Sequence, residues 1–327
     1  TLDRSSAASD VYKRQIQIDA AGNVVMGTTT AGTSVAVKAA SLQAKAAVYA
    51  GTDLSVNTQG ALTTQQTLAA KDSIALDAGG RLTNNGIIEA GVNADNSRNA
   101  QGDVRLTAQA IDNTGKTVIA SRDLSVNTGE LANQGGTLSA RRDAQLTATQ
   151  IDNQNQGRLL SAGSLGITAG QLLNSQGGLV TSTGNLTAGI GQLINRSGEL
   201  SSQAQVTLQL NELDNVAGLV SAGQSLSLNA TGLINNQGGR ITARQAAQLR
   251  AASLDNSQKG VLTSQGTLGI ELSGTLANQQ QGRIESTGGA QVKVGALDNQ
   301  QGGVLNSSQT LNLTAGAVNN SGAGQIA

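Results

Sequence analysis

One short pattern recurs along almost the whole chain and limits what the chain can fold into. Its anchor is an Asn that follows an apolar residue by two positions, as in the triplet Leu213-Asp214-Asn215. Apart from a first step of 29 residues, successive anchors are 20 to 22 residues apart. The anchors are Asn84, Asn113, Asn133, Asn153, Asn174, Asn195, Asn215, Asn235, Asn256, Asn278, Asn299 and Asn320, preceded by three weaker anchors at Asn23, Ala44 and Thr64. A fixed period of this length indicates a repeat architecture.

Within each repeat, apolar and polar residues alternate, as at Leu226/Leu228 and Leu311/Leu313. A period of 2 predicts strands with one buried face. Each strand is too short to bury a core alone, so it must pair with the same strand of the neighbouring repeat. Crossovers between parallel strands favour the right hand. We therefore predict an all-β fold, a right-handed parallel β-helix with about 20–22 residues and three short strands per coil.

The composition agrees with a thin core made of strands. The chain has 42 Gly, no Pro, no Cys, no His and only two aromatic residues, Tyr12 and Tyr49. Proline is excluded because it lacks the N–H that each strand ladder needs. Asn tolerates left-handed turn conformations, and identical Asn side chains in register can hydrogen-bond from coil to coil. The predicted structural ladder consists of Asn113, Asn133, Asn153, Asn174, Asn195, Asn215, Asn235, Asn256, Asn278 and Asn299.

The residue just before each anchor is predicted to face solvent, because its neighbours on both sides face the core. In this column Asp214 lies between Ile194 and Ile234, and no two Asp are on adjacent coils. Like charges directly opposite each other would destabilise the ladder. A leucine-rich repeat, the alternative fold, has an overlapping period but places Asn three residues after its strand. Here that position, after Leu228, is Thr231.

The repeat unit L-D-N-x-x-G-x-[LIV]-x-S-x-G-x-L-x-L resembles the filamentous-haemagglutinin repeat. The residues that carry the resemblance are Leu213-Asp214-Asn215, Ser221-Ala222-Gly223, Leu226-Ser227-Leu228, Leu297-Asp298-Asn299 and Leu311-Asn312-Leu313. The resemblance implies the β-helical shaft of a Gram-negative two-partner-secretion exoprotein, either a haemagglutinin-type adhesin or a contact-dependent growth-inhibition toxin. It further implies export through an outer-membrane transporter of the two-partner type, and a place outside the cell or on the bacterial outer surface.

Three functions follow as hypotheses. The first is a structural shaft that presents adhesive or toxin modules away from the cell. The second is a shaft that itself binds a glycan or receptor on a host or neighbouring bacterial cell. The third, a β-helical polysaccharide-cleaving enzyme, is disfavoured because the chain has no His and its Asp residues are spread along the rod rather than paired. We therefore expect no enzyme activity and no cofactor or metal.

Charge and hydropathy exclude two classes of partner. The formal net charge is zero, which argues against nucleic acid. No apolar run approaches the roughly 18 residues of a membrane-spanning helix, so we expect no membrane insertion.

Two segments depart from the repeat. Residues 92–103 lengthen the coil between Asn84 and Asn113 and should protrude from the rod. Loops on a rigid scaffold often carry binding, although a tolerated surface insertion is the simpler reading. The candidate interaction residues are Asn93, Asp95, Asn96, Arg98 and Asp103. Residues 1–15 fit no coil and read as a non-native or irregular leader. The array over 16–327 stops within a repeat, so we expect a fragment truncated at both ends.

Overall fold

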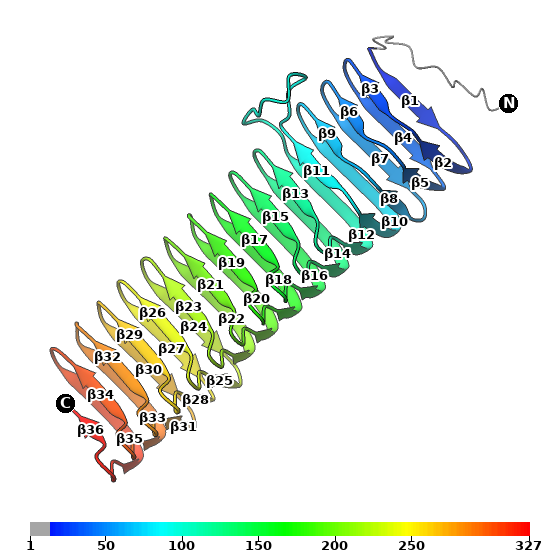
Figure 1. Ribbon diagram of the computed structural model, residues 1–327. Helices are drawn as coiled ribbons and strands as arrows, with labels where there is room; N and C mark the ends of the chain where they lie inside the picture. Colours follow the sequence, from blue (N-terminus) through cyan, green and yellow to red (C-terminus); the bar gives the residue numbers. More distant parts are fainter. Residues whose placement is uncertain (1–13) are drawn as a thin grey trace.

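The computed structural model describes residues 14–327 and contains one long stack of coils (Figure 1). Residues 1–13, most of the proposed leader, lie outside the described part. Two parallel sheets run along the stack, one of 21 strands (sheet A) and one of 15 strands (sheet B), and no α-helix occurs in residues 14–327. Equivalent strands of successive coils pair in parallel, as Glu199 of one coil pairs with Leu219 of the next. The predicted parallel β-helix is confirmed.

Each coil contributes one strand to sheet B and either one long or two short strands to sheet A. Sheet B consists of β3 (Thr29–Ala31), β6 (Val48–Ala50), β9 (Leu68–Ala70), β11 (Ile87–Ala90), β13 (Thr117–Ala120), β15 (Thr137–Ala140), β17 (Arg158–Ser161), β19 (Leu179–Ser182), β21 (Glu199–Ser202), β23 (Leu219–Ala222), β26 (Arg240–Ala243), β29 (Val261–Ser264), β32 (Arg283–Ser286), β34 (Val304–Ser307) and β36 (Gln325–Ile326). Sheet A consists of β1 (Ile16–Asp19), β2 (Asn23–Met26), β4 (Val35–Ala39), β5 (Ser41–Ala44), β7 (Leu54–Thr58), β8 (Leu62–Thr64), β10 (Ile74–Asn84), β12 (Val104–Asp112), β14 (Leu124–Ala132), β16 (Ala144–Asp152), β18 (Leu165–Leu173), β20 (Leu186–Ile194), β22 (Val206–Asp214), β24 (Leu226–Ala230), β25 (Leu233–Asn235), β27 (Ala247–Ala251), β28 (Ser253–Asp255), β30 (Leu268–Leu272), β31 (Thr275–Ala277), β33 (Ala290–Asp298) and β35 (Leu311–Asn319).

The long strands of sheet A turn a corner of the coil. In β22, Val206, Leu208 and Leu210 are buried, and after two successive exposed residues Leu213 is buried again. The alternation therefore slips by one residue where the strand bends, and both halves point into the same core. The predicted three strand segments per coil are present, but in these coils the structure joins two of them into one strand.

Turn length sets the spacing of the anchors. After Asn195 one residue, Ser197, has a left-handed conformation with φ 53° before the turn closes. After Asn153 two residues, Asn155 (φ 53°) and Gln156 (φ 66°), are left-handed. The longer turn adds one residue without moving the strands, so the next ladder residue follows Asn195 after 20 residues and Asn153 after 21.

In the coil that contains Asn235, the strand register differs from the prediction by one residue. Leu213 pairs with Ile234 and Asp214 with Asn235, so Ile234 is fully buried and Leu233 is 42% exposed. The prediction that Ile234 faces solvent is wrong. The sequence Leu-Ile-Asn-Asn fits the anchor pattern in two frames, and a slip of one residue exchanges the faces of a strand.

The first coil is shifted as well, because Met26 pairs with Ala44. Met26, rather than Asn23, occupies the anchor position of that coil. Ala44 pairs in turn with Thr64, and Thr64 with Asn84, as the weaker anchors predicted.

Candidate functional site

A column of buried Asn side chains, the asparagine ladder, runs through the stack. The Nδ2 group of Asn215 donates to Oδ1 of Asn236 at 2.7 Å and to the carbonyl oxygens of Gly218 and Arg240, each at 3.2 Å. Its Oδ1 accepts a hydrogen bond from Nδ2 of Asn195 at 2.7 Å. The same amide-to-amide link joins Asn84, Asn113, Asn133, Asn153, Asn174, Asn195, Asn215, Asn236, Asn256, Asn278, Asn299 and Asn320.

Asn235, a predicted member of this ladder, does not belong to it. Its Oδ1 accepts the backbone N–H of Gln237 at 3.3 Å on the outer side of the coil. The ladder position belongs to Asn236, which is fully buried. The misassignment has the same cause as the misplaced Ile234, namely the ambiguous frame of this coil.

Three of the Asp residues before the anchors, Asp152, Asp214 and Asp255, link adjacent coils. Asp214 accepts a hydrogen bond from Nε of Arg196 on the preceding coil at 2.6 Å, and Asp255 accepts one from Nε2 of Gln237 at 2.6 Å. Asp255 also accepts the backbone N–H of Ser257 at 3.0 Å. These carboxylates accept hydrogen bonds from the turn backbone and from side chains of the preceding coil, so their role is structural.

Residues 92–103 leave the stack between β11 and β12 (Figure 1). The tip of this loop is a tight turn, in which the N–H of Asn93 donates to the carbonyl of Ser97 at 2.8 Å. Asp95 accepts the backbone N–H of Ser97 at 2.9 Å and its hydroxyl at 2.6 Å. The Ser97 hydrogen bonds lower the pKa of Asp95, whose side chain is exposed together with that of Asn96. The loop therefore presents an ordered polar tip.

The base of the loop is fixed to the shaft. Arg98 forms an ion pair with Glu89 on sheet B. The hydroxyl of Tyr49 donates to the carbonyl of Val92 at 3.2 Å, and Nδ2 of Asn99 donates to the carbonyl of Lys71 at 2.8 Å. Burial, followed by the charge of nearby carboxylates, raises the pKa of Tyr49. Sequence reasoning missed this role of Tyr49, because the contact links coils 43 residues apart.

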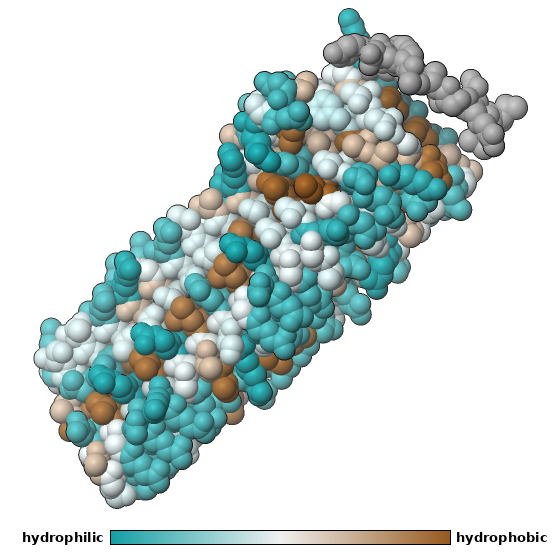
Figure 2. Space-filling model, in the orientation of Figure 1, coloured by the Kyte–Doolittle hydropathy of each residue, from teal (hydrophilic) through white to brown (hydrophobic). Residues whose placement is uncertain are grey.

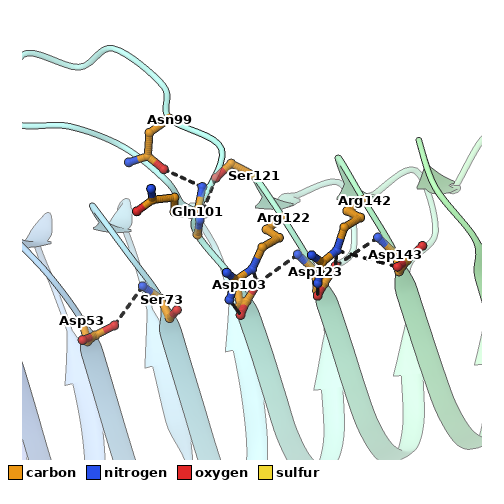
Figure 3. Close-up of polar contacts among 11 residues, drawn as sticks. Asp53, Ser73, Asn99, Gln101, Asp103, Ser121, Arg122, Asp123, Arg142 and Asp143 are labelled. Atoms are coloured by element: carbon orange, nitrogen blue, oxygen red, sulfur yellow. Dashed lines mark hydrogen bonds and ion pairs between the residues drawn. The ribbon is translucent and has the colours of Figure 1, made fainter.

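Asp103, the last predicted loop residue, lies apart from the tip in a row of alternating acids and arginines (Figure 3). Nε of Arg122 donates to Asp103 at 2.7 Å, and Nε of Arg142 donates to Asp123 at 2.7 Å. The backbone N–H of Asp123 also donates to Asp103 at 3.1 Å, and that of Asp143 to Asp123 at 3.2 Å. The Arg hydrogen bonds lower the pKa of Asp103 and of Asp123. The sequence does contain a signal for this row, the Arg122-Asp123 and Arg142-Asp143 dipeptides 20 residues apart, but the sequence interpretation did not use it.

Replacing Arg142 by Gln is expected to raise the pKa of Asp123 towards its ordinary value of about 4. In the parent the folded-state pKa lies below the unfolded value, so the pair stabilises the protein above about pH 4 and this contribution is lost as the pH falls through the folded-state pKa. The variant should therefore lose less stability on acidification. NMR titration of the carboxylate measures the shift. Arg141→Gln is the matched control, and an equal shift in both variants would contradict the pairing.

Within residues 14–327, no three His, Cys, Asp or Glu side chains are grouped closely enough to hold a metal ion. In the same part of the chain, no helix has the length and apolarity needed to cross a membrane.

Comparison with known proteins agrees with the fold. No curated protein and no solved structure gives a significant match. The haemagglutinin repeat family model, however, matches residues 13–86, 89–135, 120–189, 190–243, 217–280 and 266–327. These matches cover nearly the whole chain and confirm the resemblance to the filamentous-haemagglutinin repeat. The chain belongs to the haemagglutinin repeat family.

Proposed function

We propose that the chain is a structural shaft segment of a large secreted or surface-attached bacterial exoprotein, and that it holds adhesive or toxin modules away from the cell. The observation that carries this proposal is that the ladder and the core of the shaft continue from coil to coil without interruption. The asparagine ladder runs from Asn84 to Asn320 without a missing link, beside one connected apolar core. With a strand spacing of about 4.8 Å, the 15 strands of sheet B span about 67 Å.

Family membership and composition support an extracellular location and export by an outer-membrane transporter of the two-partner type. The chain has no Cys, so no disulfide can lock it before it crosses the outer membrane. The strands of each coil pair only with those of the neighbouring coils, so the shaft can fold coil by coil as it emerges.

Removing two whole coils, residues 174–214, should shorten the shaft by about 10 Å and preserve its fold. The deletion joins Leu173 to Asn215 and keeps the ladder in register. Small-angle scattering measures the length, and binding by a module fused to the far end of a surface-anchored chain measures presentation. Deleting 174–204, which removes one coil and part of the next, should instead disrupt the stack. Strong cell binding by the chain without any fused module would contradict a purely structural role.

The ordered loop at 92–103 supports a second candidate, a shaft that itself binds a host or bacterial cell-surface glycan or receptor. On this hypothesis, deleting residues 93–100 should weaken adhesion of the purified chain to cells at least tenfold, a loss of about 1.4 kcal/mol. The 174–214 deletion is the matched control because it shortens the rod and keeps the loop. Unchanged adhesion after the loop deletion would exclude this loop as the binding site.

A further inference from the structure

The outward face of sheet B carries a regular column of side chains. In each strand from β15 to β34 the second and fourth residues are buried and the first and third point outward, half-exposed or exposed. The first residues form a column in which charged and apolar side chains alternate, and brown and teal groups alternate along the shaft in Figure 2. This column reads Thr137, Arg158, Leu179, Glu199, Leu219, Arg240, Val261, Arg283 and Val304.

The centre of this column has a two-fold pattern of charge. About Leu219, Glu199 on one side corresponds to Arg240 on the other, and Leu179 corresponds to Val261. Among the described residues neither Glu199 nor Arg240 takes part in an ion pair. A two-fold axis through Leu219 along the strand direction would bring each acid opposite the arginine of a second copy, and would bring each apolar residue opposite another apolar residue.

We propose that this face of sheet B binds a second copy of the same chain, with the two shafts antiparallel and the axis at the rung of Leu219. Packing around a two-fold axis requires one self-complementary patch, which is what the column provides. The rung of Arg158 would face the rung of Arg283, whose charge is already paired with Glu285 in its own strand. The outer third-position side chains beside the axis, such as Ser201, Ser221 and Thr242, are small and allow the two sheets to approach.

The other arrangements of two facing shafts fit less well. A parallel pair would place Glu199 opposite Glu199 and Arg240 opposite Arg240, and like charges facing each other across an interface disfavour it. An axis at Leu179 would pair Glu199 with Arg158, but it would leave Arg240 facing Thr117. Of these arrangements, the axis at Leu219 is the one that places both Glu199 and Arg240 opposite a residue of opposite charge.

The size of the face predicts weak association. The nine strands from β15 to β34 span about 38 Å, and four residues of strand span about 13 Å. The face thus covers roughly 500 Å² on each copy, or about 1,000 Å² in total, at the lower end of specific interfaces. We expect a concentration-dependent dimer, held in place by two symmetric Glu199–Arg240 contacts.

Single-cysteine variants of the full chain locate the axis, because the native chain has no Cys. Ser221→Cys lies at the axis and should crosslink to itself through a short bismaleimide, since facing sheets pack about 10 Å apart. Ser201→Cys should crosslink poorly alone and well when mixed with Thr242→Cys. Self-crosslinking of Thr181→Cys in place of Ser221→Cys would put the axis at Leu179 and overturn the proposal.

Charge reversal tests the energetics by sedimentation velocity. Glu199→Arg should raise the dissociation constant at least tenfold, and adding Arg240→Glu to the same chain should restore it. Arg105→Glu is the matched control and should have little effect, because Arg105 is exposed on sheet A, away from the proposed interface. All three positions point away from the core, so circular dichroism should be unchanged. A monomer at every soluble concentration, or association that Glu199→Arg does not weaken, would overturn the proposal.

Discussion

Replacing Asn236 by Ala is expected to lower the free energy of unfolding by about 3–5 kcal/mol, whereas replacing its neighbour Asn235 should cost less than about 0.5 kcal/mol. The two residues are chemically identical and adjacent in the chain. They differ only in that Asn236 is a link of the asparagine ladder and Asn235 lies on the outside.

The large cost at Asn236 comes from the buried groups that lose their partners. Oδ1 of Asn256 loses its side-chain donor at 2.7 Å, and Nδ2 of Asn215 loses the shortest of its three hydrogen bonds, at 2.7 Å. The carbonyl oxygens of Gly239 and Val261 lose a donor as well. Leaving a buried polar atom unpaired costs about 1–3 kcal/mol, and a methyl group cannot compensate. Asn235 gives up only one long hydrogen bond next to solvent.

The measurement has to resolve single coils, because long repeat arrays do not always unfold in one step. Hydrogen exchange of the backbone amides near residues 215–256 reports the local stability, and the denaturant midpoint reports the whole array. The Asn236 variant should lose protection on both sides of its coil. Equal losses in the two variants would mean that the ladder contributes little to stability, and a larger loss for the Asn235 variant would mean that Asn235 continues the ladder.

Much of the fold follows from local chemistry in the sequence. The alternation with period 2 and the exclusion of Pro identify paired strands, and the repeat length identifies stacked coils. The frame of an individual coil does not follow from its own residues where two frames satisfy the pattern, as at Leu233-Ile234-Asn235-Asn236. Only pairing with the coils on either side selects the frame that buries Ile234.

The candidate site is less predictable than the core. The lengthened repeat located the segment 92–103, but its attachment depends on contacts between distant coils, such as Tyr49 with Val92. The acid–arginine row is hard to predict for the same reason. Asp103 and Arg122 are 19 residues apart, and their contact can be predicted only when the strand register is known. Contacts between coils can be predicted from a sequence only when the coils are aligned without an error of even one residue.

Adding a methyl group at Gly218 should destabilise the coil by about 2–4 kcal/mol. A Cβ at this position would lie 2.0 Å from the carbonyl oxygen of Asn195 and 2.6 Å from Oδ1 of Asn215. The carbonyl oxygen of Asn195 accepts the backbone N–H of Gly198, and Oδ1 of Asn215 accepts Nδ2 of Asn195 in the ladder, so neither atom can move without lengthening a hydrogen bond. Gly recurs after the anchors because the turn backbone passes against the preceding coil, and here the requirement is for space, not for a positive φ.

Gly189→Ala is the matched control for Gly218→Ala. A Cβ at Gly189 meets no atom within 4 Å, and the residue lies in the strand β20. The added methyl group restricts the unfolded chain, so this variant should be neutral or stabilised by up to about 1 kcal/mol. Hydrogen exchange around residues 195–219 distinguishes the two variants. If Gly218→Ala were tolerated as well as Gly189→Ala, the coil would have to relax at its turn, and the close contact between turn and ladder could not be what selects Gly after each anchor.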